Sequence, residues 1–322
     1  MDTSKYDTVI IDEDIIFNTI IRNKTDIDIP TLKMLKKKIA PESAIQKKIN
    51  QVLKHSKTSE LFTLSEIDYD LECDDDKPMG VDIPSFCSAT HFCFRKASDR
   101  EDNIQGDCVS FLNPVKFKKD TKYIMLSATV DKTVCEYYFG KDNMKFQECK
   151  KAKYKGTLDQ YCDKSMSRGY IDRYPGIIKL IEKHFDSDYI ICFQKYGLGD
   201  LYFGNAAGCD ELKGKNIAVI GTPHQPEWIY KLFAYSIKLD FDKDAKVKPN
   251  NIVTHNGYKF RFTTYDDEVL RAVQFYMIES NLEQAVGRAR LLRYNCTVNL
   301  FSNFPLCQAN LKESEYEKES TQ

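Results

Sequence analysis

The amino-acid sequence of 322 residues predicts an α/β fold built on parallel sheets. First, short apolar runs rich in β-branched residues, such as residues 6–15 and 189–193, are typical of buried parallel strands. Second, segments with apolar residues at helical spacing, such as 174–185, alternate with these runs. Third, acidic residues lie near the end of the first run, at the strand end where α/β sheets bind ligands. The length is enough for two domains.

The composition describes a globular chain. Hydrophobic residues make up 42% and charged residues 30% of the sequence, and no apolar run is long enough for a membrane span. The formal net charge of −1 gives no overall attraction to nucleic acid, so such binding would need local patches. Eleven Cys and no recognisable leader lead us to expect a reducing, cytoplasmic location. Cys73, Cys87, Cys93 and Cys108 leave a metal site open, beside the alternative of buried or idle thiols.

Two predicted strands in the first part of the chain end in polar residues. The run 6–15 contains Asp12 and Glu13, and the run 122–129 ends in Ser127, Ala128 and Thr129. Acids at the carboxyl end of a buried parallel strand are placed to meet a ligand. The alternative is a strand-to-loop junction with solvated acids.

The segment between these strands predicts an insertion. Pro30 and Pro41 each lie in the first turn of a predicted helix. Between Lys33 and Lys57 there are eight lysines and one acid, Glu42, which leaves two alternatives open: a surface facing nucleic acid and a solvated helix face. The runs 91–95 and 108–112 predict a β-hairpin, and the acidic stretch 66–76 predicts an exposed loop.

The second part of the chain predicts an alternation of strands and helices. A Gly-rich turn at 204–210, which includes Gly208 and Asp210, precedes the apolar run 217–220. Asn256-Gly257 predicts a hairpin turn. The remaining expectations are a first strand within 144–154, helices over 174–185, 229–237 and 269–280, strands at 189–193 and 296–302, and a flexible tail at 312–322.

The stretch Gln284–Arg293 carries a Gln, a Gly and three Arg, and we expect it at a helix N-terminus. Arg is always charged and has a rigid fork of donors, so closely spaced Arg residues suit a polyphosphate. The alternative is an ordinary basic helix end.

In this order the motifs resemble the later part of superfamily 2 DNA/RNA helicases of the DEAD/DEAH-like kind. Gln284-x-x-Gly287-Arg288-x-Arg290 is similar to motif VI, and Asp12-Glu13 is similar to motif II. Residues 127–129 resemble motif III, and 189–193 resemble motif IV. The turn 204–210 and the strand after it are similar to motif V of the DinG-like branch.

The resemblance implies two RecA-like domains of the P-loop NTPase class, with ATP and Mg²⁺ as cofactors. It implies a partial first domain at 1–134 with an insertion at about 19–112, and a complete second domain at 135–311. By resemblance Asp12 would hold Mg²⁺ and Glu13 would activate water. Ser127 and Thr129 would couple the nucleotide to the nucleic acid. The nucleotide contacts would come from Gly208, Asp210, Gln284, Gly287, Arg288, Arg290 and Arg293, and which Arg is the finger stays open.

The family's P-loop, G-x-x-x-x-G-K-[ST], is missing, because Gly214-Lys215 is followed by Asn216. We therefore expect this chain to be inactive alone and to need an upstream polypeptide that supplies the P-loop, from a split or truncated gene. With it, the expected function is ATP hydrolysis coupled to movement along, or unwinding of, single-stranded or duplex nucleic acid, with DNA favoured over RNA. The alternative is a non-catalytic nucleic-acid-binding or partner-binding module derived from a helicase.

Overall fold

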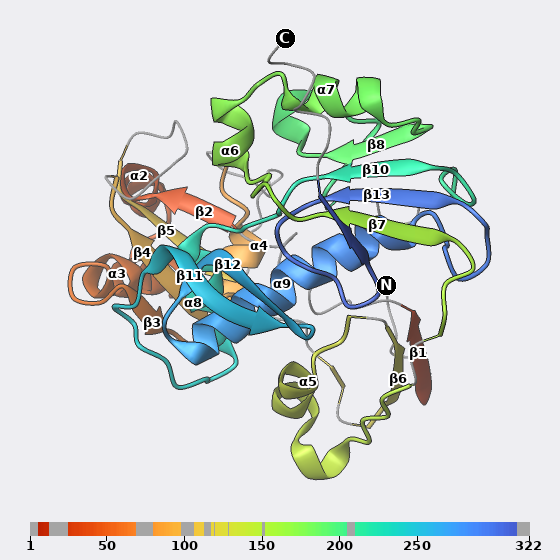
Figure 1. Ribbon diagram of the computed structural model, residues 1–322. Coiled ribbons are helices and arrows are strands. Elements are labelled where there is room, and N and C mark those ends of the chain that lie inside the picture. The colour runs from red at the N-terminus through yellow and green to blue at the C-terminus, as the bar shows by residue number, and fades with distance from the viewer. Residues whose placement is uncertain are drawn as a thin grey trace. The chain divides into compact units, whose positions relative to one another are not determined.

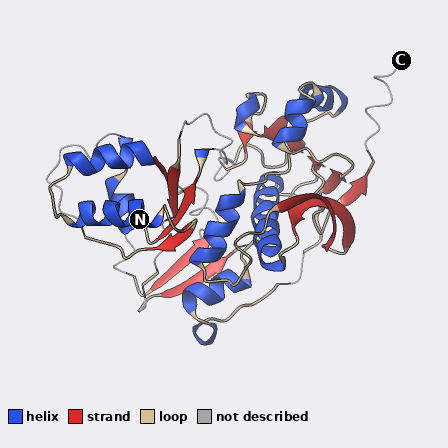
Figure 2. Ribbon diagram, turned by 90° about the vertical axis from the view of Figure 1, so that its left-hand side faces the viewer, coloured by secondary structure: helices blue, strands red, loops and turns tan. Residues whose placement is uncertain are grey.

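The computed structural model (Figure 1) is a mixed α/β protein (Figure 2). It describes residues 6–12, 25–68, 80–97, 106–112, 117–118, 120–127, 129–149, 152–204 and 210–313. Contacts divide the chain into two compact units. Unit 1 comprises Met1–Ile11, Ile15–Ile124 and Glu227–Phe241, and unit 2 comprises Asp12–Asp14, Met125–Pro226 and Asp242–Gln322. Among the described residues, no helix has both the length and the apolarity to cross a membrane.

Unit 1 is built on a four-stranded antiparallel sheet in the order β2-β5-β4-β3. Its strands are β2 (Thr25–Asp28), β3 (Leu61–Thr63), β4 (His91–Arg95) and β5 (Cys108–Leu112). The predicted hairpin is confirmed, because β4 and β5 pair antiparallel with Phe92 opposite Phe111. Both rings are fully buried, so they anchor the sheet to the core of the unit.

Helices α2 (Ile29–Lys38), α3 (Ala44–His55) and α4 (Ile83–Ser88) pack on this core. Both predicted helices are confirmed, but Pro41 does not lie in the first turn of the second one as expected, because it precedes Ser43, the N-cap of α3. Pro30 lies in the first turn of α2, and the Ser43 side chain caps α3 by accepting a hydrogen bond from the Gln46 amide. The helices bury Leu32 and Ile49, with others at the same spacing, against the sheet.

Helix α8 (Glu227–Ser236) also belongs to unit 1, whereas the sequence analysis placed it in the second domain. The Arg95 guanidinium lies 4.6 Å from the ring of Trp228, the only Trp of the chain. Arg95 also lies 3.0 Å from the Asp26 carboxylate and donates a 2.8 Å hydrogen bond to Ser110. These contacts join α8 to three strands, and sequence neighbourhood does not reveal them.

Lys48 differs from the exposed lysines of the stretch 33–57, because its side chain is fully buried. Its ammonium donates to the carbonyl oxygens of Ser65, Cys87 and Ala89 at 3.0, 2.6 and 2.8 Å. A buried ammonium is tolerated when its donors are satisfied in this way. Lys48 thus ties α3 to the segments around β3 and α4.

The strands that carry the first predicted motifs form a separate two-stranded sheet, β1 (Thr8–Asp12) with β6 (Lys122–Leu126). The expectation of a buried first strand is wrong, because Ile10 is 66% and Leu126 is 57% exposed. Apolar residues of parallel strands are buried only when further layers cover them, and the described residues add no third strand to this sheet. Helix α5 (Lys132–Phe139) and the short η3 (Lys141–Asn143) follow β6.

Unit 2 contains a parallel sheet of six strands in the order β14-β7-β13-β10-β8-β9. Its strands are β7 (Thr157–Tyr161), β8 (Tyr189–Cys192), β9 (Leu201–Tyr202), β10 (Ile217–Ile220), β13 (Thr297–Phe301) and β14 (Asn310–Lys312). The predicted parallel α/β arrangement is therefore confirmed at this level. The strand expected within 144–154 is wrong. The described part of that segment is mostly exposed and lysine-rich, and the first strand, β7, buries Leu158 and Gln160.

Helices cover both faces of this sheet (Figure 1). Alternate residues explain this, since Ile191 and Val219 face the core under α9 (Glu268–Gly287). Ile190 and Ala218 face the core under α7 (Ile177–His184), which begins shortly after α6 (Arg168–Arg173). The predicted hairpin is confirmed as β11 (Val247–His255) and β12 (Tyr258–Tyr265), with Asn256-Gly257 at its turn. The expected tail begins within β14, and residues 314–322 lie outside the described part.

The environment of Lys48 leads to a stability prediction. Lys48→Met keeps the volume but removes three hydrogen bonds and leaves buried carbonyl oxygens without a donor, so we expect a loss of about 2–4 kcal/mol in the free energy of unfolding. Lys47→Met, an exposed neighbour on the same helix, should change it by less than about 0.5 kcal/mol. Denaturant unfolding measures both, and equal effects would contradict the assigned role of Lys48.

Candidate functional site

The arginine-rich stretch lies at the end of α9, not at a helix N-terminus as expected. The N-cap of α9 is Asp267, whose side chain accepts a 2.8 Å hydrogen bond from the Leu270 amide. Buried apolar residues then continue to Val286, and the helix ends at Gly287. The expectation fails because the acids near 279–283 lie inside this long helix and do not mark its start.

Arg290 stands in the turn that follows α9 and has a left-handed backbone with φ 57°. Its carbonyl oxygen accepts hydrogen bonds from the amides of Arg293 and Tyr294 at 2.8 and 3.1 Å. Gly normally occupies this conformation at a helix end, and another residue costs about 1–2 kcal/mol there. The side chain is 47% exposed, so it is not retained at this strained position to fill the core.

The loop before β10 brings Asp210 to this turn. The Asp210 carboxylate lies 2.6 Å from the Lys213 ammonium and 4.0 Å from the Arg290 guanidinium. The hydrogen bond from Lys213, together with the charges of Arg290 and Arg288, holds the pKa of Asp210 below its usual range. The carboxylate therefore remains ionised beside three cations.

Backbone hydrogen bonds lock the two loops together. The Gly214 amide donates to the Ala289 carbonyl at 3.0 Å, and the Lys155 and Gly156 amides donate to the Leu291 carbonyl at 2.9 and 3.0 Å. Ala289 and Leu291 are themselves buried in the core under the sheet. The turn that presents Arg290 is thus fixed from both sides.

This junction lies at the amino end of the parallel sheet. The loop 210–216 leads into β10, the turn 288–296 leads into β13, and Lys155-Gly156 leads into β7. Because the three strands are parallel, the segments that lead into them meet at the same end of the sheet, where the strands begin. The sequence analysis expected ligands at the carboxyl ends of the parallel strands, which lie at the opposite end of this sheet.

The other predicted residues of the arginine-rich stretch differ in environment. Arg288 is buried, with 5% exposed. The Nε2 atom of Gln284 is buried and makes no hydrogen bond to the described residues. Gly287 borders open space, and Arg293 is exposed.

The residues predicted to handle metal and water are only partly described. Asp12 is exposed at the end of β1, whereas Glu13 and Gly208 lie outside the described residues. The Ser127 and Thr129 hydroxyls lie 3.2 Å apart, and Ser127 also accepts a hydrogen bond from the Thr129 amide at 3.1 Å. Within the described part of the chain, His, Cys, Asp and Glu form no group of three or more that could hold a metal ion.

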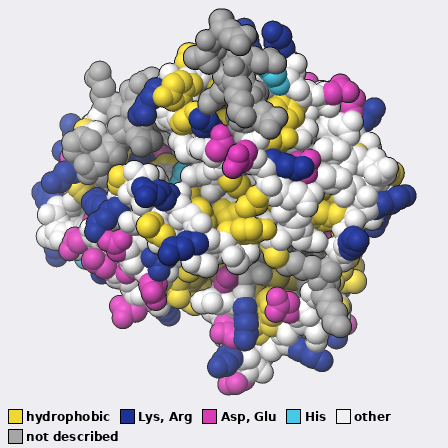
Figure 3. Space-filling model, in the orientation of Figure 1, with side chains coloured by type: hydrophobic (Ala, Val, Ile, Leu, Met, Phe, Trp, Pro, Cys, Tyr) yellow, Lys and Arg dark blue, Asp and Glu magenta, His cyan; other side chains and the backbone are white. Residues whose placement is uncertain are grey.

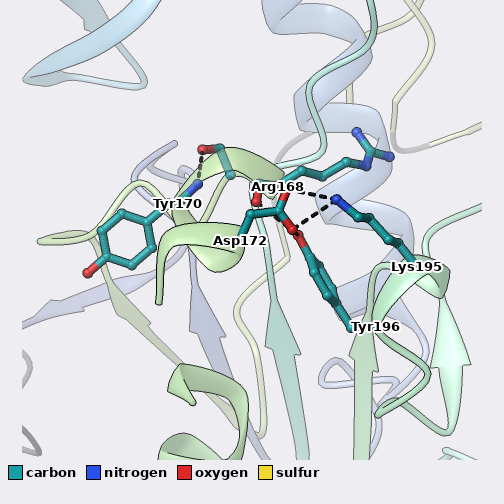
Figure 4. Close-up of polar contacts among 6 residues, drawn as sticks. Arg168, Tyr170, Asp172, Lys195 and Tyr196 are labelled. Carbon is teal, nitrogen blue, oxygen red and sulfur yellow. Dashed lines mark hydrogen bonds and ion pairs between the residues drawn. The ribbon is translucent and has the colours of Figure 1, made fainter. Parts of the chain in front are cut away.

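A second polar cluster, which the sequence analysis did not identify, lies at the carboxyl end of β8 (Figure 4). Asp172 of α6 accepts a 2.7 Å hydrogen bond from Lys195 and a 3.1 Å one from the Tyr196 hydroxyl. The bond from Lys195 lowers the pKa of Asp172, and burial, with Asp172, raises that of Tyr196 to about 12. Arg168 stacks on the Phe193 ring at 4.4 Å. The cluster joins α6 to the turn η4 (Gln194–Tyr196).

Three of the four cysteines considered for a metal site are buried thiols. Cys87, Cys93 and Cys108 are buried, and Cys73 lies outside the described residues. Burial raises the pKa of Cys87 to about 11 and raises that of Cys93 as well. These thiols are therefore protonated at neutral pH.

In comparisons with known proteins, no family model, no curated protein and no solved structure matches this chain.

The packing of the junction generates a prediction about two glycines. A Cβ at Gly156 would overlap the Cys296 carbonyl oxygen and lie 2.8 Å from that of Tyr294, whereas a Cβ at Gly287 would meet nothing. Gly156→Ala should lower the free energy of unfolding by about 1–3 kcal/mol. The matched Gly287→Ala, at the end of a helix, should leave it unchanged or raise it by up to about 1 kcal/mol. Thermal unfolding of both variants checks this, and a stable Gly156→Ala variant would show that the junction is looser than described.

Proposed function

We propose that unit 2 supplies one side of the nucleotide site of a helicase-like ATPase. In this proposal a polypeptide with a P-loop holds ATP, and hydrolysis drives movement along DNA or RNA. The observation that carries the proposal is the approach of Asp210 and Arg290 to 4.0 Å from loops far apart in the sequence. These are two of the residues that the helicase resemblance selects.

The charge of the junction suits a polyphosphate. Arg290, Arg288 and Lys213 act together on one carboxylate, Asp210, so positive charge is in excess. Guanidinium groups bind phosphate oxygens through paired hydrogen bonds. Half-exposed side chains on a rigid turn can make such bonds without a change in the fold.

Arg288 and Arg290 then have different roles. Arg290 is half-exposed and holds a strained backbone conformation, so we assign it the contact with phosphate. Arg288 is buried and acts through its charge on Asp210. Gln284, Gly287 and Arg293 remain candidates for further contacts, and so do Asp12 and Glu13 for Mg²⁺.

A second candidate function is the binding of nucleic acid without ATP hydrolysis, and the lysines of unit 1 favour it. Its helices α2 and α3 carry most of the lysines of the stretch 33–57 on exposed positions.

The strained turn allows a direct test of the proposed function. Arg290→Gly should lower the affinity for inorganic tripolyphosphate at least about tenfold, since a charge-assisted pair contributes about 1.5–3 kcal/mol. It should leave thermal stability unchanged or higher, because Gly adopts this conformation without strain. Titration calorimetry with tripolyphosphate and with ATP, beside thermal melts, measures both effects.

The control is Arg173→Gln, which neutralises an exposed Arg at the end of α6. It should leave the affinity for tripolyphosphate unchanged. Equal losses in the two variants, or no tripolyphosphate binding by the unmodified chain, would refute the assignment of Arg290.

A further inference from the structure

Helices α2 and α3 of unit 1 divide their residues between a buried and an exposed face. Leu32 and Leu35 of α2, and Ile49 and Val52 of α3, are buried in the core. The opposite faces are exposed and carry lysines. We define the α2–α3 lysine surface as Lys33, Lys37, Lys38, Lys47, Lys54 and Lys57, all of them exposed.

The charge of this surface is barely compensated within its own segment. The stretch from Lys33 to Lys57 contains one acid, Glu42, which lies 3.5 Å from Lys47 with both side chains exposed. The whole chain has a net charge of −1, so the excess of positive charge is confined to this part of the chain and is not a property of the whole sequence. In Figure 3, basic side chains lie over the part of unit 1 that carries α2 and α3 in Figure 1, with acidic side chains beside them.

The amino-acid composition of this stretch favours a duplex over a single strand as the partner. Residues 29–57 contain no Phe, Tyr or Trp, and the ring of His55 already stacks on Phe62 with 5.4 Å between the ring centroids. The stretch therefore lacks the aromatic rings on which single-strand binders stack unpaired bases. Lysines act as point charges on phosphates. Lys47 and Lys54 are two turns apart on α3, about 10 Å along its axis. A nucleic-acid duplex offers one phosphate charge per about 1.7 Å of its axis.

We propose that the α2–α3 lysine surface binds the sugar-phosphate backbone of double-stranded nucleic acid, without sequence preference. The contact is separate from the nucleotide site proposed for unit 2 and does not depend on it. It adds to that proposal a defined place on unit 1 at which a duplex is held.

The test uses the full chain and a fluorescein-labelled duplex, with binding followed by anisotropy at about 50–200 mM salt. The test variant combines Lys33→Gln, Lys37→Gln and Lys47→Gln. The matched control combines Lys141→Gln, Lys179→Gln and Lys183→Gln, which neutralise three exposed lysines of unit 2. We expect the test variant to lose at least about tenfold in affinity at low salt, and its salt slope to fall by about 2–3. The control should keep both.

Circular dichroism and tripolyphosphate binding accompany each variant. Unchanged spectra and unchanged tripolyphosphate affinity are expected, because the substituted lysines are exposed and lie outside the Asp210–Arg290 junction. The proposal is overturned if the two variants lose duplex affinity equally or if the salt slope does not change. It is also overturned if the surface prefers single strands, or if anionic phosphatidylserine vesicles bind to it in place of the duplex.

Discussion

The hydrogen bond from the Gly214 amide to the Ala289 carbonyl is the contact on which the candidate site depends. It joins the loop that carries Asp210 to the turn that carries Arg290, and both loops are anchored in the core by buried neighbours, Leu212 and Ala289. Gly214 has φ 72°, and a Cβ there would lie 3.1 Å from the Tyr294 ring. The close approach therefore needs glycine for its backbone conformation and for its lack of a side chain. Without this contact, the carboxylate and the guanidinium would have no fixed separation.

Unit 1 is held by a different device, which is the burial of charged groups with their partners. Arg95 forms an ion pair with Asp26, donates a hydrogen bond to Ser110 and lies over the Trp228 ring, and Lys48 donates hydrogen bonds to carbonyl oxygens. Such groups contribute little net stability against an apolar alternative, but removal of one partner is costly. They specify which segments meet, and so explain why α8, from far along the chain, completes the core of this unit.

The parts of the fold that local pattern determines could be predicted from the sequence. The hairpin of β4 and β5, the buried strands β8 and β10, and the turn at Asn256-Gly257 follow from β-branched runs and turn residues. What failed depends on tertiary context. The exposure of β1 depends on which layers cover it, and the assignment of α8 depends on contacts with distant strands.

The candidate site, like the fold, could be predicted from the sequence only in part. The motif order selected Asp210 and Arg290, and the structure places them together. The motifs could not reveal Lys213 or Gly156, because the roles of these residues arise from loops that meet only in the folded chain. The end of α9 was also misplaced, because acids inside the helix resembled a starting signal. A count of apolar positions from Leu270 to Val286 would have located it.

The central claim is that the junction of Asp210 and Arg290 is where unit 2 meets phosphate. An NMR titration of the ¹⁵N-labelled chain with inorganic tripolyphosphate tests it most directly. The account predicts that the amide shifts of residues 210–215 and 288–294 move together and saturate with one affinity. It would be contradicted if these amides stayed unchanged while those around Arg168 and Lys195, at the opposite edge of the sheet, moved instead.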